Sequence, residues 1–362
     1  MHILPRLTIF FFLFPMCLAA QTDSVYLDNN IVKKEKKSKK PTLFEHLSSD
    51  PSITEVTLTT NMDSLIDNKF KDIEVPSVYA YQLDGKDYNW NVKISPRGKS
   101  RKTICEMPPY LLNFQRDELK DQGVKRKHDK LKMVNFCKNG KRFDYYLFRE
   151  YLIYKIYNII TDNSFKVKLI HVNYVDAQGD YEPDERYSFL IEDTDEMADR
   201  LKAKEVNKYD VSPDSCSSFD YDVLSMFQFM ISNTDWNIQL LHNTKLIKKK
   251  KTGEIIVVPY DFDYSGLVNA EYSVPNPDYV QFGVRHRVYI GDYPTDEEVA
   301  KVIELYQSKE QEIYQLINDF ELLDKGWRKD MNKFIRKFYK LLKNPKKLKK
   351  KCKPRKNDYR GA

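Results

Sequence analysis

The sequence lacks the short motifs by which several common enzyme classes are recognised. It has no G-x-S-x-G segment, and its six histidines form no cluster, so serine hydrolases and zinc hydrolases are poorly supported. It also has no G-x-G-x-x-G loop and no apparent internal repeat. Its five cysteines follow no zinc-binding spacing. These absences leave carboxylates as the main candidates for chemistry.

Long hydrophobic runs are also absent beyond the N-terminus, so no later segment is expected to span a membrane. The N-terminus itself has the pattern of a secretory signal over residues 1–20. Basic residues His2 and Arg6 precede an apolar run, Leu7–Leu18, and Ala19-Ala20 offers small residues for cleavage. A retained anchor is the alternative, but the run is short for a spanning helix. We therefore expect an exported protein, in the periplasm, at the cell surface or secreted, with no transmembrane segment after signal cleavage.

Cysteine is scarce in the expected mature chain, which keeps four of the five. An oxidising compartment permits a disulfide, and Cys105 with Cys137 is the favoured pair because both flank strand-like segments of one region. Two buried free thiols are the alternative.

The residues that are present have a globular composition. Of 362 residues, 41% are hydrophobic, and 25 are Tyr and 20 Phe. The net charge of +7 is uneven, because lysines concentrate at residues 33–40 and 346–356. Such blocks usually form solvated tails, although the C-terminal one could contact an acidic surface. A nucleic-acid partner is not expected for an exported protein.

Hydrophobic periodicity predicts a strand-rich region followed by a mainly helical one. Strands are expected at 54–59, 77–83, 89–94, 110–114, 130–136, 166–174 and 186–192, with a long helix at 143–161. Helices are expected at 195–204, 219–232, 295–320 and 327–342. A β-hairpin that ends at residue 258 is expected between the helices 219–232 and 295–320. The predicted organisation is a signal peptide (1–20), a polar basic linker (21–50), a strand-rich lobe (51–192), a helical lobe (193–344) and a basic tail (345–362).

Two acidic motifs stand at the ends of apolar segments. Asp235 follows the apolar helix 219–232, and Asp261 and Asp263 follow the apolar strand of the hairpin. Alone, Asp235 would be read as a solvated or capping residue. Two aspartates separated by one residue would repel each other in a strand unless a cation lies beside them. Together the motifs suggest a phosphoryl-transfer site with oxygen ligands for Mg²⁺ or Mn²⁺.

The ordered set of motifs resembles the spore-coat-protein-kinase (CotH) family of atypical secreted protein kinases. The resemblance covers roughly residues 78–290. It rests on the following segments: Arg97-Gly98-Lys99-Ser100-Arg101, Leu147-Phe148-Arg149-Glu150, Tyr187 to Glu192, Asn233-Thr234-Asp235-Trp236 and Pro259-Tyr260-Asp261-Phe262-Asp263. The fold that the resemblance implies is α+β and two-lobed, protein-kinase-like, with a strand-rich N-lobe and a mainly helical C-lobe.

The resemblance also implies an ATP-dependent transfer of the γ-phosphate to a Ser or Thr hydroxyl of an exported protein. In that scheme Asp235 is the catalytic aspartate, Asp261 the leading metal ligand and Asp263 the second. Arg97 and the Gly98 turn would approach the nucleotide phosphates, and Glu192 would mark the hinge beside adenine. Lys132 and Glu150 would form the cation–carboxylate pair that holds the phosphates.

The sequence departs from the protein-kinase pattern at several places. The second metal-binding Asn is expected five residues after Asp235, where Leu240 stands. Asn243 is the preferred replacement and Asn237 the alternative. The segment 110–114 has no lysine where family members often have one. The alternative function is therefore a catalytically inactive, kinase-like interaction module of the cell envelope or surface.

Overall fold

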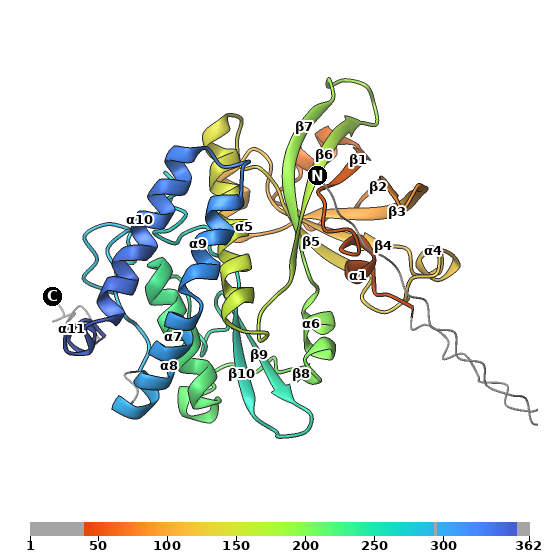
Figure 1. Ribbon diagram of the computed structural model, residues 1–362. Coiled ribbons are helices and arrows are strands. Elements are labelled where there is room, and N and C mark those ends of the chain that lie inside the picture. Colours follow the sequence, from red (N-terminus) through yellow and green to blue (C-terminus); the bar gives the residue numbers. More distant parts are fainter. Residues whose placement is uncertain (1–39, 293–294, 353–362) are drawn as a thin grey trace, which may run out of the picture. The chain divides into compact units, whose positions relative to one another are not determined.

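The computed structural model describes residues 40–292 and 295–352 (Figure 1). These belong to one compact unit that begins at Lys40. The expected signal peptide, most of the expected linker and the end of the basic tail lie outside the described residues. Within the described part of the chain, no helix is long and apolar enough to cross a membrane, in agreement with the sequence.

Seven strands of the first half close into a barrel in the order β1-β2-β3-β4-β5-β7-β6. Closure comes from β1 and β6, which pair in parallel from Thr54 beside Ile170 to Thr60 beside Asp176. The strands are β1 (Thr54–Thr60), β2 (Val75–Leu83), β3 (Lys86–Pro96), β4 (Tyr110–Phe114), β5 (Lys130–Val134), β6 (Val167–Asp176) and β7 (Asp184–Ile191). Because closure removes the free sheet edges, the barrel offers no open edge for pairing with another chain.

Aromatic side chains fill the barrel. Burial alternates along β2 and β3, as the period-two pattern predicts. The rings of Tyr81 and Tyr88 stack with centroids 5.1 Å apart, and Tyr88 stacks on Trp90 at 5.9 Å. Asp84-Gly85 turns the hairpin, since both residues take the positive φ that a two-residue hairpin of this kind requires.

Helices and a three-stranded sheet form the second half. The sheet has the order β10-β9-β8, from β8 (Ala203–Glu205), β9 (Thr244–Lys249) and β10 (Ile255–Pro259). The main helices are α5 (Lys141–Ile160), α7 (Ser218–Ile231), α8 (Asp296–Ser308), α9 (Glu310–Asp319) and α10 (Lys325–Leu342). Short helices are α1 (Leu43–Leu47), α2 (Met62–Asp67), α3 (Lys99–Ile104), α4 (Arg116–Asp121), α6 (Thr194–Arg200), the 3₁₀ turn Pro213–Ser215 and α11 (Pro345–Lys351). Figure 1 shows the long helices gathered on the side of α5 away from the barrel.

The expected two-lobed protein-kinase-like fold is wrong. The strands expected to form an N-lobe instead form a closed seven-stranded barrel, and a separate small sheet accompanies the helices. The physical reason is the parallel pairing of β1 with β6, which joins residues more than a hundred positions apart. Local periodicity predicts strands, but it carries no information on whether their outermost members meet.

Several local expectations also need correction. The helix expected at 295–320 is divided at Lys309 into α8 and α9. The end of the expected linker contains α1, whose Leu43, Phe44 and Leu47 are buried with the barrel core. The start of the expected solvated tail forms α11, in which Leu348 is buried. The basic turn after β3 contains the short helix α3. In α1 and α11, a few buried apolar residues order segments whose composition is otherwise polar.

The disulfide between Cys105 and Cys137 is confirmed. It joins the end of α3 to the segment between β5 and α5, and the backbone N–H groups of Glu106 and Met107 both donate to the carbonyl of Cys137. Of the cysteines that the structure describes, Cys216 and Cys352 are free thiols. The bond therefore fixes α3 relative to the start of α5.

Removing this bond should destabilise the protein. We expect Cys105→Ser with Cys137→Ser to lower the free energy of unfolding by about 3–4 kcal/mol. The unfolded chain gains conformational entropy, because the cross-link between residues 32 positions apart no longer restricts it. Urea unfolding followed by circular dichroism measures the change. Cys216→Ser, which removes a free thiol, is the matched control and should alter stability little. Equal stability of the double variant and the wild type would contradict the prediction.

Candidate functional site

Asp235 is positioned by a turn directly after α7. Ser232 ends the helix in the left-handed conformation, with φ of 57°. The buried Asn233 then fixes the chain, because its backbone N–H donates to the Gln228 carbonyl (2.8 Å) and its side chain accepts from the Asp235 N–H (3.0 Å). The apolar helix is held in the core, so the turn delivers the Asp235 side chain to the surface, where it is 37% exposed.

Both oxygens of the Asp235 carboxylate have defined partners. Oδ1 lies 2.8 Å from Nε2 of His242, and Oδ2 accepts from the Asn243 side-chain amide at 3.0 Å. The same amide donates to the Asp235 carbonyl at 2.8 Å. Asn243, which the sequence suggested as a metal ligand, thus orients Asp235 here.

Asp261 lies beside this loop although it comes from β10. The Tyr260 N–H donates to the Asn243 carbonyl at 3.0 Å, which joins the two acidic motifs. Asp261 has φ of 62°, an uncommon conformation for a residue other than glycine, and its N–H donates to the Tyr154 hydroxyl at 2.8 Å. Its side chain is 39% exposed. The strained backbone turns this carboxylate away from the strand direction.

A single guanidinium lies among three carboxylates next to Asp261. The Arg101 side chain contacts Glu150 at 2.5 Å, Asp263 at 2.9 Å and Asp261 at 3.5 Å. Arg101, Glu150 and Asp263 are buried. The expected pair between Lys132 and Glu150 is not formed, because Glu150 pairs with Arg101 instead.

The charges of this cluster are not balanced. Burial raises the pKa of Glu150 and of Asp263, although Arg101 acts to lower both. Burial acts to lower the pKa of Arg101, but the charges of Asp263 and Glu150 raise it well above its ordinary value. When all three acids are ionised, one guanidinium leaves an excess of negative charge. A further cation beside Asp261 would therefore be stabilised.

The pKa of His242 is influenced by carboxylates of both acidic motifs. Its hydrogen bond with Asp235 raises its pKa, and the charge of Asp261 acts in the same direction. Burial and the charge of Lys99 oppose this rise. Of these groups, Asp235 contacts the imidazole directly, with Oδ1 2.8 Å from Nε2.

Lys132 belongs to a neighbouring basic cluster. Its Nζ lies 5.4 Å from the ring centroid of Tyr260, the residue before Asp261, and 3.3 Å from the hydroxyl of Thr194. Burial lowers the pKa of Lys132 to about 8, and the positive charges of Arg97 and Lys245 act in the same direction. The charges of Asp193 and Glu205 oppose this lowering, and Glu205 forms an ion pair with Lys245 at 2.8 Å.

The last two predicted residues have structural roles in the described fold. Gly98 has φ of 86° and begins α3, which carries Arg101. Glu192 is buried, and its carboxylate accepts from Arg200 at 2.8 Å and from the Lys166 N–H at 3.0 Å. The Glu192 side chain is therefore occupied within the protein and lies apart from the acidic residues.

Sequence reasoning missed the roles of Arg101, His242 and Tyr154. Arg101 and His242 stand within segments that the sequence singled out, in the basic turn after β3 and directly before Asn243. Tyr154 carried no signal, because one tyrosine on a buried helix resembles any core aromatic residue.

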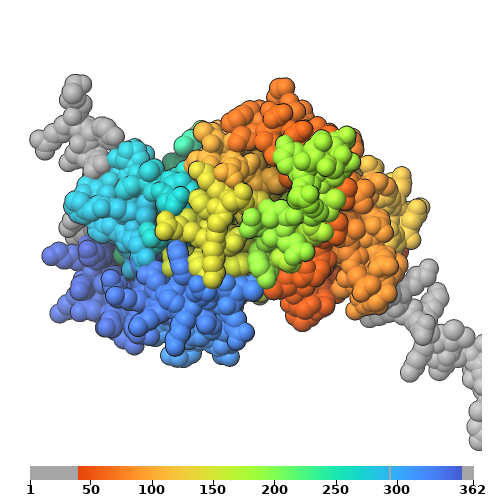
Figure 2. All heavy atoms as spheres, turned by 90° about the horizontal axis from the view of Figure 1, so that it is seen from above, coloured from red at the N-terminus to blue at the C-terminus, as the bar shows by residue number. Residues whose placement is uncertain are grey.

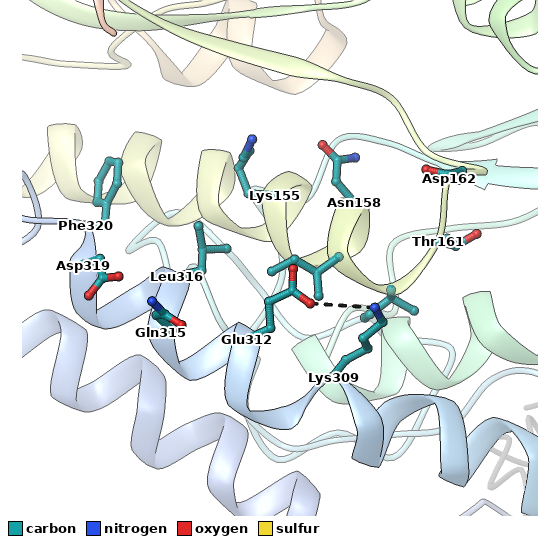
Figure 3. Close-up of a pocket in the computed structure, with 12 residues that line it drawn as sticks. Lys155, Asn158, Thr161, Asp162, Lys309, Glu312, Gln315, Leu316, Asp319 and Phe320 are labelled. Carbon is teal, nitrogen blue, oxygen red and sulfur yellow. Dashed lines mark ion pairs between the residues drawn. The ribbon is translucent and has the colours of Figure 1, made fainter. Parts of the chain in front are cut away.

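A groove of about 800 Å³ lies elsewhere, between α5 and α9 (Figure 3). Lys155 and Asn158 line it from α5, and Lys309 and Glu312, an ion pair at 3.7 Å, line it from the α8–α9 region. None of the predicted site residues lines this groove. Its size alone does not make it the functional site, since its polar groups include no convergent acidic or basic cluster.

No protein-family model matches the chain, and no curated protein matches it significantly. The resemblance to the CotH family therefore stays a prediction from the motifs.

The Arg101 cluster yields a direct test of its energetic role. Arg101→Met leaves Glu150 and Asp263 buried without their cation, so we expect a loss of about 3–5 kcal/mol in the free energy of unfolding at neutral pH. The loss should shrink at acidic pH, where both carboxyls are protonated. Urea unfolding at the two pH values measures it.

Arg116→Met is the matched control, because Arg116 pairs with Asp129 but is 62% exposed. Its loss should be much smaller, because solvent screens an exposed ion pair. Equal effects of the two substitutions would show that the buried cluster does not stabilise the fold.

Proposed function

We propose that the protein is an exported phosphotransferase that uses ATP and a divalent metal to phosphorylate a Ser or Thr hydroxyl of a protein. The observation that carries the proposal is that Asn243 joins the two acidic motifs, because its side chain donates to Asp235 and its carbonyl accepts from the Tyr260 N–H, next to Asp261 and the Arg101 cluster. The proposal rests on this site and not on the fold.

Asp235 has the role of orienting the acceptor. Its carboxylate is exposed on one side, while His242 and Asn243 hold both oxygens in place. The acceptor oxygen forms a bond to the γ-phosphorus, the bond to the bridging oxygen of ADP breaks, and the hydroxyl proton passes to Asp235. A carboxylate fixed before the reaction avoids the cost of orienting it during the reaction.

The residues around Asp261 fit a Mg²⁺ or Mn²⁺ ion that is shared with substrate phosphates. Within the described residues, no group of three or more His, Cys, Asp or Glu could hold a metal alone. Mg²⁺ commonly takes only one or two carboxylates and fills its other positions with phosphate and water. Asp261 would be the leading ligand and Asp263 the second. When bound, the metal neutralises charge on the transferred phosphate.

The basic cluster supplies the contacts for the other phosphates. The positive charges of Arg97 and Lys245 act to lower the pKa of Lys132, and within the described residues Lys132 makes no ion pair with a carboxylate. A polyphosphate beside Tyr260 would relieve this repulsion and would lie next to Asp261. The turn at Gly98 would bring Arg97 to the same phosphates.

The export part of the proposal is supported by the disulfide, because such bonds persist in oxidising compartments. The substrate would then be another exported protein.

One observation favours a second candidate, a catalytically inactive interaction module. Arg101 already occupies Asp263 and Glu150, as a metal would otherwise do. In that case nucleotide or partner binding would occur without transfer.

Replacement of the orienting carboxylate tests the catalytic role. Asp235→Asn should lower phosphate transfer by about 10²- to 10⁴-fold, because the proton acceptor is lost. Nucleotide affinity should stay unchanged, since Asp235 does not contact the phosphates in this scheme. The measurement is transfer from γ-labelled ATP, with Mn²⁺, to the protein itself and to Ser- and Thr-containing peptides.

Asp278→Asn, at an exposed aspartate, is the matched control and should retain full transfer. Absence of transfer by the wild type, with nucleotide binding intact, would contradict the catalytic proposal and favour the inactive module.

Lys132 gives a pH test of the phosphate contacts that needs no activity. Its pKa of about 8 means that it loses its charge as the pH rises through that value. ATP affinity should therefore fall above pH 8 in the wild type. Lys132→Met should weaken binding by about tenfold or more below that pH and remove the decline. Isothermal titration without metal measures both.

Lys204→Met, at an exposed lysine of β8, serves as the control and should bind ATP like the wild type. A decline above pH 8 that persists in Lys132→Met would show that another group causes it.

A further inference from the structure

A pocket of about 370 Å³ lies between the segment 280–289 and α11, away from the acidic residues. Figure 2 shows the segment after β10, in cyan, adjoining the blue C-terminal helices on the surface. The pocket is lined by Phe282, His286 and Arg287 on one side and by Lys347, Lys350 and Lys351 on the other.

The charge of this pocket is of one sign. Among the described residues, neither Arg287 nor any of the three pocket lysines forms an ion pair with a carboxylate. Lys349, on the same helix, instead pairs with Asp296 of α8 at 2.8 Å. The helix thus directs one lysine to an acidic neighbour and leaves three at the pocket.

Arg287 contributes a charge that is fixed in the protein. Its side chain donates to the carbonyls of Met230 (3.0 Å) and Phe334 (2.8 Å), and its guanidinium stacks on the Phe334 ring at 3.8 Å. Burial lowers the pKa of Arg287 to about 9, with Arg285 acting in the same direction. A half-buried cation whose hydrogen-bond acceptors are neutral carbonyls is stabilised by an anion that enters the pocket.

Apolar side chains protrude beside these cations. Phe282 is 87% exposed, and Val280, in the same segment, is 37% exposed. The Phe282 ring stacks on the His286 ring, with centroids 5.2 Å apart, and most of its surface stays exposed. An exposed aromatic ring beside several cations suits an anionic surface that also accepts apolar side chains.

We propose that this face binds the surface of an anionic phospholipid bilayer. Phe282 enters the boundary between headgroups and acyl chains, and Lys347, Lys350 and Lys351 contact lipid phosphates. One headgroup phosphate occupies the pocket beside Arg287. The combination of an exposed aromatic residue with several lysines is typical of proteins that lie on such membranes. The sequence continues with Lys353, Arg355 and Lys356, which extends the positive charge.

Vesicle co-sedimentation tests this proposal. Residues 21–362, which retain every described residue, are mixed with phosphatidylcholine vesicles that either contain or lack phosphatidylglycerol. We expect binding to the anionic vesicles only, and we expect it to weaken as salt is added. No binding by the wild type to phosphatidylglycerol vesicles would overturn the proposal.

Variants locate the contact. Lys347→Glu with Lys350→Glu should reduce vesicle binding by about 20-fold or more. Phe282→Ser should reduce it several-fold without a change in net charge. Lys204→Glu with Lys248→Glu, at exposed lysines of β8 and β9, makes the same charge change elsewhere and should bind nearly as well as wild type. Equal losses in both double variants would overturn the assignment to this face.

A soluble acidic peptide, polyglutamate, distinguishes a protein partner from a bilayer. Binding of polyglutamate at this face without vesicle binding would contradict the proposal. Nucleotide affinity should be unchanged in these variants, so the result is independent of the proposed phosphotransfer.

Discussion

One buried guanidinium connects the parts of this protein that carry its candidate chemistry. Arg101 comes from the segment between two barrel strands, Glu150 from α5 and Asp263 from the chain after β10. An ionised carboxylate is costly to bury unless a cation or hydrogen bonds compensate its charge. The disulfide at Cys105 holds the end of the same short helix, and the Cys105 N–H donates to the Arg101 carbonyl. Loss of this cation would remove the ion pairs that connect the barrel segment to Glu150 and Asp263.

The same interaction limits what the site can do. Arg101 neutralises part of the negative charge near Asp261, so a metal would meet a cluster that already contains a cation. Asp235 does not pair with Arg101, because its hydrogen-bond partners are His242 and Asn243. In the proposed function, the site would combine an acceptor-orienting carboxylate that is already in position with a metal position that depends on substrate phosphates.

The proposed functions occupy separate faces of the described unit. The proposed phosphotransfer site involves α3, α5 and the ends of α7 and β10, whereas the proposed bilayer contact involves α11 and the segment 280–289. Both depend on cations without carboxylate partners, Lys132 at the first and Arg287 at the second. Such residues stay charged at neutral pH only at a cost in stability, which an anionic ligand offsets.

The sequence by itself indicated most of the longer elements and where the acidic residues would stand along them. An apolar helix ending before Asp235 and an apolar strand ending before Asp261 were both readable from periodicity. The pair Cys105 with Cys137 was suggested by their positions beside strand-like segments, with two free thiols as the alternative, and the structure contains the bond. Only the tertiary structure decided that the strands close into a barrel and that Glu150 pairs with Arg101. Those contacts join residues 49 or more positions apart, and they result from how the elements pack, which local patterns do not encode.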